Sequence, residues 1–361
     1  MDTEKKHTEK EEMKKDKKAK RASGGSRLTL WLLVSIGILV IVGIIAITPY
    51  MVKGSHYAAT IRIPKNATIT NVKDTLTKYY GEDYTGKVMK LLKLGNFKPE
   101  ERYGAYDFPE GTSAFAVMRK LTRGGQSPVR LTINGFRSIP FLAERISAKM
   151  DFSTEDFIKA ATDSTFLAQY GLNKDNALAL FVDDTYEVYW TSSPEEVLKK
   201  IGDNYQNLWS EVRVEDAKDL GLKPVDVMII ASMTDDETNQ DNEKGKIGRL
   251  YINRLDINMK LQSCPSVKFA LQDFTLRRIT EAHTKVDSPY NTYIHPGLPP
   301  GPLRTTSRKT VTAILQSQPS NDLYMCARED FSGYHHFSST YEEHLEHAKI
   351  YQQKLDERGI K

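Results

Sequence analysis

The chain has 361 residues, of which 51 are basic and 47 are acidic, and its formal net charge at pH 7 is +4. The N-terminal tail, residues 1–27, holds ten of the basic and six of the acidic side chains, so it carries the whole net charge. Because the rest of the chain is neutral overall, the charge gives no indication of a nucleic-acid partner. Only two cysteines occur, Cys264 and Cys326, which excludes a disulfide-rich scaffold but leaves open whether these two pair.

Residues 28–52 are predicted to form a membrane-spanning helix. These 25 residues contain no charged side chain. At about 1.5 Å of rise per residue, such a helix reaches about 37 Å, enough to cross a hydrocarbon core of about 30 Å. Trp31 and Tyr50 lie near its ends, where aromatic side chains favour the membrane interface. A cleaved signal peptide is the alternative, but the apolar segment is long for one and the sequence after Ile47 offers a poor cleavage site, so we expect an uncleaved anchor.

The charges beside this segment predict its orientation. Five basic residues follow Asp16 with no acidic residue between them: Lys17, Lys18, Lys20, Arg21 and Arg27. Because a positive flank stays in the cytoplasm, residues 1–27 are predicted to form a cytoplasmic basic tail and residues 53–361 to lie outside. The tail is also poor in apolar residues, which predicts that it lacks a fixed structure.

Residues 53–130 predict a small α/β module. Alternating apolar and polar side chains at 59–63 indicate a strand, and the spacing of apolar residues predicts helices over 72–79 and 115–121. The Gly-Gly-Gln sequence at 124–126 ends the second helix and indicates a domain boundary. The sequence of this module contains no catalytic cluster.

Residues 131–361 predict a second domain that is mainly helical, with short strands. Apolar side chains recur at helical spacing in six segments: 141–150, 154–161, 194–208, 225–238, 243–257 and 341–358. A loop rich in proline and glycine, Tyr290–Pro302, lies between the last two. The whole pattern predicts an α+β fold class with an N-terminal transmembrane helix.

The segment 225–238 ends in three acidic residues that differ in direction. On a helix Ile230, Met233 and Glu237 share one face, whereas Asp235 projects about 200° away from Glu237. Glu237 therefore continues the face that is most apolar. A carboxylic acid held against apolar surroundings has its charged form disfavoured, which is how a glutamate becomes a general acid near neutral pH. The alternative is a helix end with ordinary solvated acids.

The loop Tyr290–Pro302 is a second candidate for a binding surface. Its tyrosines and asparagine lie between proline and glycine residues that restrict the backbone. Tyr290, Asn291 and Tyr293 suit stacking on a sugar ring and hydrogen bonding to an amide. A structural turn packed over the core is the alternative.

Other catalytic signatures are missing from the sequence. It contains no GxSxG elbow, no Walker loop and no dinucleotide-binding fingerprint. His344 and His347 lie one helical turn apart, which suits a metal, and His335 could lie in a cleft. The sequence supplies too few further ligands to predict a metal site.

Four segments of the second domain carry a family resemblance. They are Ala231–Thr238, Tyr251–Leu255 with Met259–Ser266, the pair Tyr290–Tyr293 and Gly297–Pro302, and His335 and Phe337 with His344. Together they resemble the endolytic murein transglycosylases, the YceG-like family of membrane-anchored enzymes of the bacterial cell wall. The Tyr-Asn-Thr-Tyr and Gly-Leu-Pro-Pro-Gly-Pro pair is specific. In the first module, Ile63–Asn66 and Pro109–Gln126 are similar to the family's LysM-like region.

The resemblance implies an architecture and an activity. It implies a LysM-like module over 53–130 and a YceG-like catalytic domain over 131–361. The activity implied is that of a lyase, which cleaves the β-1,4 bond between N-acetylmuramic acid and N-acetylglucosamine in peptidoglycan and leaves 1,6-anhydro ends. No metal or organic cofactor is implied. The chain would lie in the bacterial inner membrane, with its catalytic part outside the cytoplasm, close to peptidoglycan strands and peptidoglycan synthases.

The resemblance also assigns residues. Glu237 matches the second of two glutamates in the family's acidic segment and is the expected catalytic acid, in agreement with the helical-face argument. The amide and phenol groups that suit N-acetyl and hydroxyl groups of a sugar belong to four candidate substrate-binding residues: Asn253, Gln262, Tyr290 and Asn291.

Two positions depart from the family pattern. Asp235 replaces the first glutamate, and a proton donor shortened by one methylene is displaced by about an ångström, which can cost on the order of 100-fold in rate. Cys264 replaces an aspartate. These departures motivate the alternative of a non-catalytic, glycan-binding scaffold. A hydrolytic muramidase that pairs Glu237 with Asp235 is a further alternative, and the opposed directions of the two carboxylates argue against it.

Overall fold

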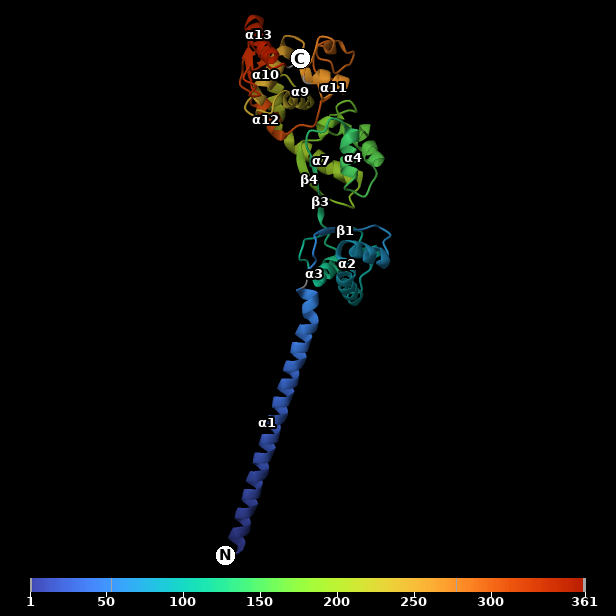
Figure 1. Ribbon diagram of the computed structural model, residues 1–361, viewed down its shortest axis with the longest axis vertical. Helices are drawn as coiled ribbons and strands as arrows, with labels where there is room; N and C mark the ends of the chain where they lie inside the picture. Colours follow the sequence, from blue (N-terminus) through green and yellow to red (C-terminus); the bar gives the residue numbers. More distant parts are fainter. Residues whose placement is uncertain (1, 53, 277, 360–361) are drawn as a thin grey trace. The chain divides into compact units, whose positions relative to one another are not determined.

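The structure is a computed structural model, and it describes residues 2–52, 54–276 and 278–359. The chain divides into two compact units, Met1–Ser127 and Pro128–Lys361. Most elements of both units are helices, and within the described residues the strands form three two-stranded antiparallel sheets (Figure 1). The prediction of a largely helical chain with short strands and one N-terminal apolar helix is confirmed.

The N-terminal helix α1 extends over Asp2–Met51. Its part Thr29–Met51 is long and apolar enough to cross a membrane, and the rest of the protein buries none of it. The prediction that the tail lacks a fixed structure is wrong for its described residues, because the helix already begins at Asp2. The tail is rich in lysine and glutamate, which favour a helix, and the apolar segment that follows supplies a nucleus from which the helix extends.

The remainder of the first unit is a pair of strands covered by helices. Its elements are β1 (Ala59–Ile63), α2 (Ile69–Leu94), the short 3-10 helix η1 (Pro99–Glu101), β2 (Gly104–Phe108) and α3 (Ala114–Arg123). β1 has the predicted bounds and pairs with β2 so that Ala59 lies opposite Phe108. The alternate side chains of Ile61 and Ile63 are fully buried against the helices, as a strand with one buried face requires.

Helix α2 includes the predicted segment 72–79 but continues well beyond it. A capping box begins the helix: the Thr68 hydroxyl accepts a hydrogen bond from the Asn71 amide, and the Asn71 side chain accepts one from the Thr68 amide. Gly81 has a φ of +78°, so the helix is interrupted there and resumes toward Leu94. The sequence pattern predicted only the part before this interruption.

The second unit is mainly helical around two strand pairs. β3 (Pro128–Ile133) pairs with β4 (Asp184–Tyr189), and β5 (Tyr324–Ala327) pairs with β6 (His335–Ser338). The helical elements, in chain order, are α4 (Ile139–Ser147), α5 (Thr154–Ala161), α6 (Ser164–Ala168), η2 (Ala177–Leu180), α7 (Pro194–Leu208), α8 (Glu211–Asp219), α9 (Pro224–Glu237), α10 (Lys244–Asp256), α11 (Cys264–Leu271), η3 (His283–Lys285), α12 (Arg308–Leu315) and α13 (Tyr341–Glu357).

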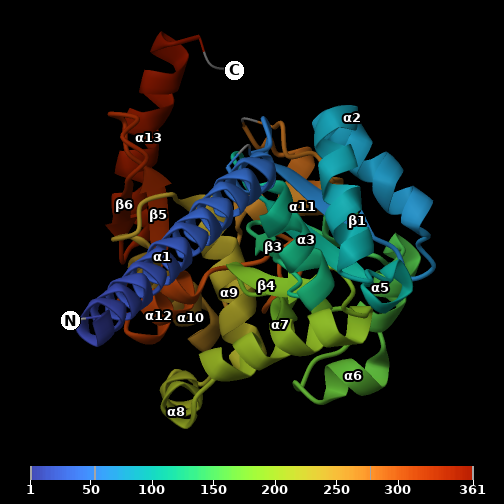
Figure 2. The ribbon, with the colours of Figure 1, turned by 90° about the horizontal axis from the view of Figure 1, so that it is seen from below.

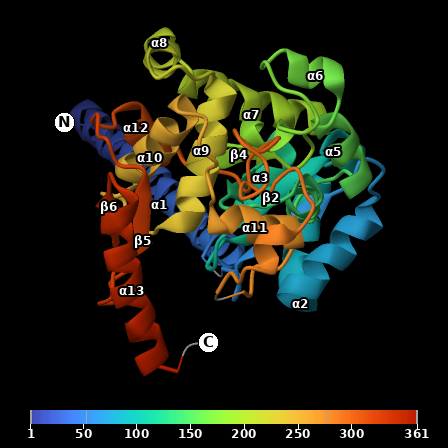
Figure 3. The ribbon, with the colours of Figure 1, turned by 90° about the horizontal axis from the view of Figure 1, so that it is seen from above.

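Most residues of helix α9 are buried in the core of the second unit. It contacts α8, α10, α11 and α12, and Figure 3 shows it lying among these helices. Every residue from Val227 to Thr234 is buried, as expected for a helix that is apolar on all sides. At one edge of the unit, α13 packs along β5 and β6 (Figure 2). The three acidic residues therefore lie at the end of a helix whose body is fixed by the core.

Candidate active site

Three consecutive carboxylates, Asp235, Asp236 and Glu237, end helix α9. Because successive helical residues point about 100° apart, each enters a different environment. The helical spacing predicted that Asp235 and Glu237 diverge, and the structure confirms it, since these two side chains share no hydrogen-bonding partner.

Glu237 has one oxygen fixed by two hydroxyl groups. Its Oε1 atom accepts hydrogen bonds from the Tyr251 hydroxyl and the Ser263 hydroxyl, each at 2.9 Å. No described residue donates to Oε2, and the side chain is partly exposed, so this second oxygen is available to a ligand. Burial raises the pKa of Glu237, while the two hydrogen bonds and nearby His335 oppose that rise.

The two hydroxyl groups are themselves held in place. Tyr251 lies on α10, and its ring is fully buried. Burial and the adjacent charge of Glu237 raise the pKa of Tyr251 well above its usual value, so it remains a donor near neutral pH. Ser263 precedes α11, and its amide donates to the Thr292 hydroxyl at 2.9 Å. Ser266 contacts the same hydroxyl at 2.8 Å, so the Pro/Gly-rich loop fixes the position of Ser263.

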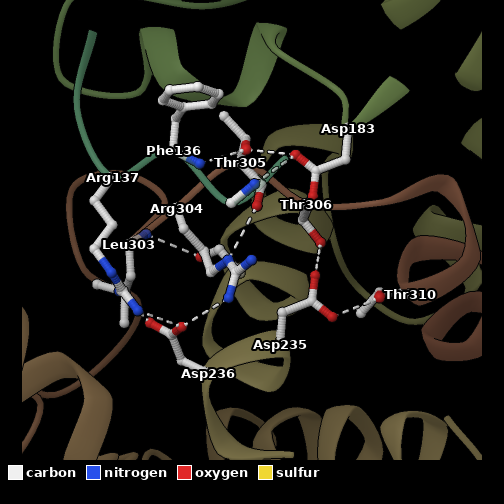
Figure 4. Close-up of polar contacts among 12 residues, drawn as sticks. Phe136, Arg137, Asp183, Asp235, Asp236, Leu303, Arg304, Thr305, Thr306 and Thr310 are labelled. Carbon is white, nitrogen blue, oxygen red and sulfur yellow. Dashed lines mark hydrogen bonds and ion pairs between the residues drawn. The ribbon is translucent and has the colours of Figure 1, made fainter. Parts of the chain in front are cut away.

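Asp235 belongs to a different network, which is drawn in Figure 4. Its oxygens accept hydrogen bonds from the Thr306 hydroxyl at 2.5 Å and the Thr310 hydroxyl at 2.7 Å. Lys244 lies 2.9 Å from the same carboxylate, and the aspartate side chain is only 10% exposed. These contacts tie α9 to α10, to α12 and to the segment that precedes α12.

Asp236 is an anchor of the same kind. Arg137 donates two hydrogen bonds to it, at 2.5 and 2.8 Å, and Arg304 donates a third at 3.2 Å (Figure 4). Nearby, Asp183 accepts from the Thr305 hydroxyl at 2.5 Å, and burial raises the pKa of Asp183. Sequence reasoning missed these partners, because nothing in a single sequence relates residues that are about a hundred positions apart.

Two of the predicted substrate-binding residues present groups to the surface. Gln262 is exposed, its side-chain amide has no partner among the described residues, and it directly precedes Ser263. Its φ of +48° is uncommon for a residue with a side chain, and its backbone amide donates to the Thr292 carbonyl at 3.1 Å. Tyr290 is half-buried, with its ring centroid 4.6 Å from that of Phe269.

The other two predicted residues use their amides inside the protein. The Asn253 amide donates to two backbone carbonyls within residues 320–322, at 2.9 and 3.0 Å. Asn291 is fully buried, and its amide donates to the carbonyls of Thr284 and Val286, at 3.0 and 2.8 Å. The structure therefore places both asparagines as supports of loops, and Asn291 presents no group to a ligand. Substrate contact by Asn253 stays a prediction.

Comparisons with known proteins give the family of this chain. The sequence profile of the YceG-like family matches residues 61–350. The chain belongs to the YceG-like family. An endolytic murein transglycosylase of Bacillus subtilis strain 168 is 23% identical over 324 residues, which cover 85% of this chain and 88% of that protein. One from Streptococcus pneumoniae D39 is 24% identical over 302 residues, 74% of this chain and 54% of that protein, so the chain spans about half of its length.

A solved structure supports the fold. The crystal structure of a putative YceG-like protein from Listeria monocytogenes is 23% identical to this chain. It matches with a TM-score of 0.54 over 81% of this chain and 99% of that one. This similarity concerns the fold alone.

Cys264, which departs from the family pattern, lies near the carboxyl group of Glu237 but makes its hydrogen-bonding contact with Tyr293. The Cys264 sulfur is 3.4 Å from the Tyr293 hydroxyl, and burial raises the pKa of the thiol. Cys264 and Cys326 are both free thiols in this structure. With Cys264 in place, the neighbouring Ser263 still donates a hydrogen bond to Glu237.

A histidine and a second glutamate complete the surroundings of Glu237. His335 in β6 lies with its Nδ1 atom 3.0 Å from Glu243, and its backbone amide donates to the same carboxylate at 2.9 Å. Both side chains are almost buried, with 11% and 7% exposed. Sequence reasoning named His335 but missed Glu243, which immediately precedes α10. His344 and His347 stack on Tyr324 and His336 instead.

Proposed function

We propose that this chain is an endolytic murein transglycosylase, a lyase that cuts the glycan strands of peptidoglycan. Membership of the YceG-like family and the names of the two curated relatives support the class of activity. The observation that carries the chemistry is the carboxyl group of Glu237. One of its oxygens is fixed by two hydroxyl groups, the other is free, and burial favours its protonated form.

The proposed reaction uses this one carboxyl group twice. Protonated Glu237 gives its proton to the glycosidic oxygen, and the bond from that oxygen to C1 of N-acetylmuramic acid breaks. An oxocarbenium-like centre forms at C1. The C6 hydroxyl oxygen of the same sugar then bonds to C1 and closes a 1,6-anhydro ring, while its proton returns to Glu237. Acid and base are thus one group at successive moments, and no water is consumed.

The contacts of Glu237 suit both moments. Burial disfavours the ionised form and raises the pKa of Glu237, which favours the protonated acid that the leaving oxygen needs. After that proton has left, hydrogen bonds from Tyr251 and Ser263 stabilise the carboxylate until the C6 proton arrives. No free energy is needed to reorient the two hydroxyl groups, because core packing already holds Tyr251 in position and the Pro/Gly-rich loop already holds Ser263.

A hydrolytic mechanism would need a second, positioned carboxylate to activate water. Asp235 was the candidate, and its acceptor positions are occupied by Thr306, Thr310 and Lys244. This arrangement favours the intramolecular reaction and 1,6-anhydro ends over hydrolysis and reducing ends. No contact in the described residues favours the glycan-binding scaffold in particular.

Substrate contacts and placement complete the proposal. Gln262 and Tyr290 are the candidates that reach a glycan directly, and Asn253 is a further candidate whose amide supports residues 320–322. We assign the part of the first unit that follows the span as a LysM-like module and the second unit, from Pro128, as the catalytic domain. The boundary predicted after residue 130 lies inside β3, which pairs with β4 of the second unit. The helix of residues 28–52 would anchor the chain in the inner membrane with residues 1–27 in the cytoplasm, close to strands that peptidoglycan synthases have just made.

Product analysis tests this proposal. The purified full chain is incubated with glycan strands, and mass spectrometry measures 1,6-anhydro ends. Glu237→Gln keeps an oxygen that accepts from Tyr251 and Ser263 but cannot donate an acidic proton, so product formation should fall by about 100-fold to 10,000-fold. Glu281→Gln, at an exposed carboxylate, is the control and should retain full activity.

Each other outcome rejects part of the proposal. Undiminished product from Glu237→Gln would remove Glu237 from the mechanism. Reducing ends from the unmutated chain would indicate a hydrolase, and strand binding without any shortening would indicate the scaffold.

A further inference from the structure

The C-terminal end of α2 carries an exposed apolar side chain between lysines. Leu94 is 84% exposed, more than any other large apolar residue in the part of the chain that the structure describes, the membrane span included. Lys90 and Lys93 lie beside it, and both are exposed. A single exposed leucine is common on protein surfaces, but Leu94 also lines one cavity together with apolar side chains of α1 and α3, which makes a contiguous apolar surface.

The charge around Leu94 has one sign. Residues 86–99 contain four lysines and no acidic residue. Lys87 pairs with Asp83 and Lys98 with Glu101, whereas neither Lys90 nor Lys93 has an acidic partner among the described residues. The exposed leucine therefore lies in a small, uncompensated basic surface.

This surface lies beside the membrane span. One cavity is lined by Ala46, Ile47, Tyr50 and Met51 of α1, by Lys90, Leu91, Lys93 and Leu94 of α2, and by Phe115 of α3. The span ends at Met51, and Ala46 lies about 7.5 Å deeper along the helix. The end of α2 and Phe115 therefore lie at the level of the last turns of the span, where headgroups meet acyl chains.

The connection between α1 and the rest of the first unit requires the same proximity. Gly54 forms an antiparallel β-bridge with Ser113. The Ser55 amide donates to the Thr112 carbonyl and the Ser55 carbonyl accepts from the Gly111 amide, each at 2.9 Å. From Met51 to Gly54 the chain can reach only about 11 Å. The start of α3 therefore cannot move away from the membrane surface, whatever the tilt of the span.

We propose that the C-terminal end of α2, together with Phe115, docks into the bilayer leaflet at the Met51 end of the span. Leu94 and Phe115 enter the boundary between headgroups and acyl chains, and Lys90 and Lys93 contact the phosphates of anionic lipids. The partner is the lipid surface because it is continuous with the span and complements both the apolar and the basic side chains. A second attachment point restrains the first unit from tilting about its short connection.

The test measures membrane insertion of the full chain in lipid nanodiscs. Leu94→Trp is compared in discs with and without brominated lipid, and the quenching of the native tryptophans in the unmutated chain is subtracted. The emission of the new tryptophan should fall by about twofold, because bromine quenches only groups that enter the bilayer. Ile69→Trp, at the exposed opposite end of α2, is the matched control and should not be quenched. Absence of quenching at position 94, or equal quenching at both positions, would overturn the proposal.

The lipid charge is tested with a second variant. Lys90→Glu and Lys93→Glu are combined with Leu94→Trp in discs of phosphatidylglycerol and in discs of phosphatidylcholine. Quenching should decrease in the anionic discs and change little in the neutral ones. If the charge reversal has the same effect in both lipids, the lysines do not bind anionic headgroups and that part of the proposal is wrong. Both lysines are exposed, so circular dichroism should show an unchanged fold.

Discussion

The hydroxyl of Tyr251 provides a direct test of how Glu237 is tuned. In Tyr251→Phe the buried ring keeps its shape, and only the hydrogen bond of 2.9 Å to Oε1 is lost. This bond favours the ionised carboxylate and therefore opposes the rise in pKa that burial causes. Its removal should raise the pKa of Glu237 further.

The size of the shift follows from the energy of the bond. A hydrogen bond to a charged group contributes about 1.5 to 3 kcal/mol, and about 1.4 kcal/mol corresponds to one pKa unit. The Ser263 hydroxyl remains and compensates in part, so we expect a rise of about one unit. The alkaline limb of the pH profile of kcat/KM reports the loss of the proton from the free enzyme's acid, and it should move to higher pH by that amount.

The assay is the formation of 1,6-anhydro ends from glycan strands at a series of pH values. Tyr293→Phe is the matched control, because Tyr293 is another partly buried tyrosine whose hydroxyl contacts Cys264 rather than the carboxylate, and its limb should not move. Ser263→Ala should move the limb in the same direction as Tyr251→Phe. An alkaline limb that stays in place or moves to lower pH in Tyr251→Phe would refute the reasoning.

Three further predictions concern stability and binding. Burial raises the pKa of Glu237 above that of an unfolded glutamate, so the ionised side chain destabilises the fold at pH values above about 4.3. Glu237→Gln should therefore raise the melting temperature at about pH 8 but not at about pH 4. Equal shifts of the melting temperature at both pH values would contradict this. Asp236→Ala leaves Arg137 and Arg304 without their carboxylate and should lower the free energy of unfolding by about 3 kcal/mol in urea titrations, whereas a loss below about 1 kcal/mol would show that solvent replaces the contact. Gln262→Gly removes an exposed amide and also a left-handed backbone strain, so KM for glycan strands should rise while the melting temperature does not fall; an unchanged KM would exclude Gln262 from substrate binding.

The sequence predicted the elements whose pattern is strong and local. Helices 154–161 and 194–208 and the strand 59–63 have the predicted bounds, because their caps and apolar spacing are complete within the segment. Helices α8 and α12 were not predicted, since each is short and depends on packing against α9. The pairing of β3 with β4 joins segments about fifty residues apart, a distance over which no local pattern extends.

In the candidate site, too, only the features that depend on local sequence could be predicted. The direction of Glu237 follows from helical geometry alone, so its separation from Asp235 could be predicted. The donors to Glu237 could not, because Tyr251 and Ser263 come from two further segments and Ser263 is positioned by Thr292 from a third. The partners of Asn291 could not be predicted for a related reason: an amide in a loop suits a sugar or a backbone carbonyl equally well, and only the fold shows that its amide donates to the carbonyls of Thr284 and Val286.

The contacts of Asp235 show what the residue does at the position that departs from the family pattern. An aspartate at this position is one methylene shorter than a glutamate, and Thr306, Thr310 and Lys244 meet it at 2.5 to 2.9 Å. Donors therefore reach the shorter side chain at close range, and Asp235 serves as an anchor between helices. Glu237 keeps its own donors from α10 and from the residue before α11, which do not touch Asp235. The separate contacts of Asp235 and Glu237 support the proposal that Glu237, and not the residue at position 235, is the acid.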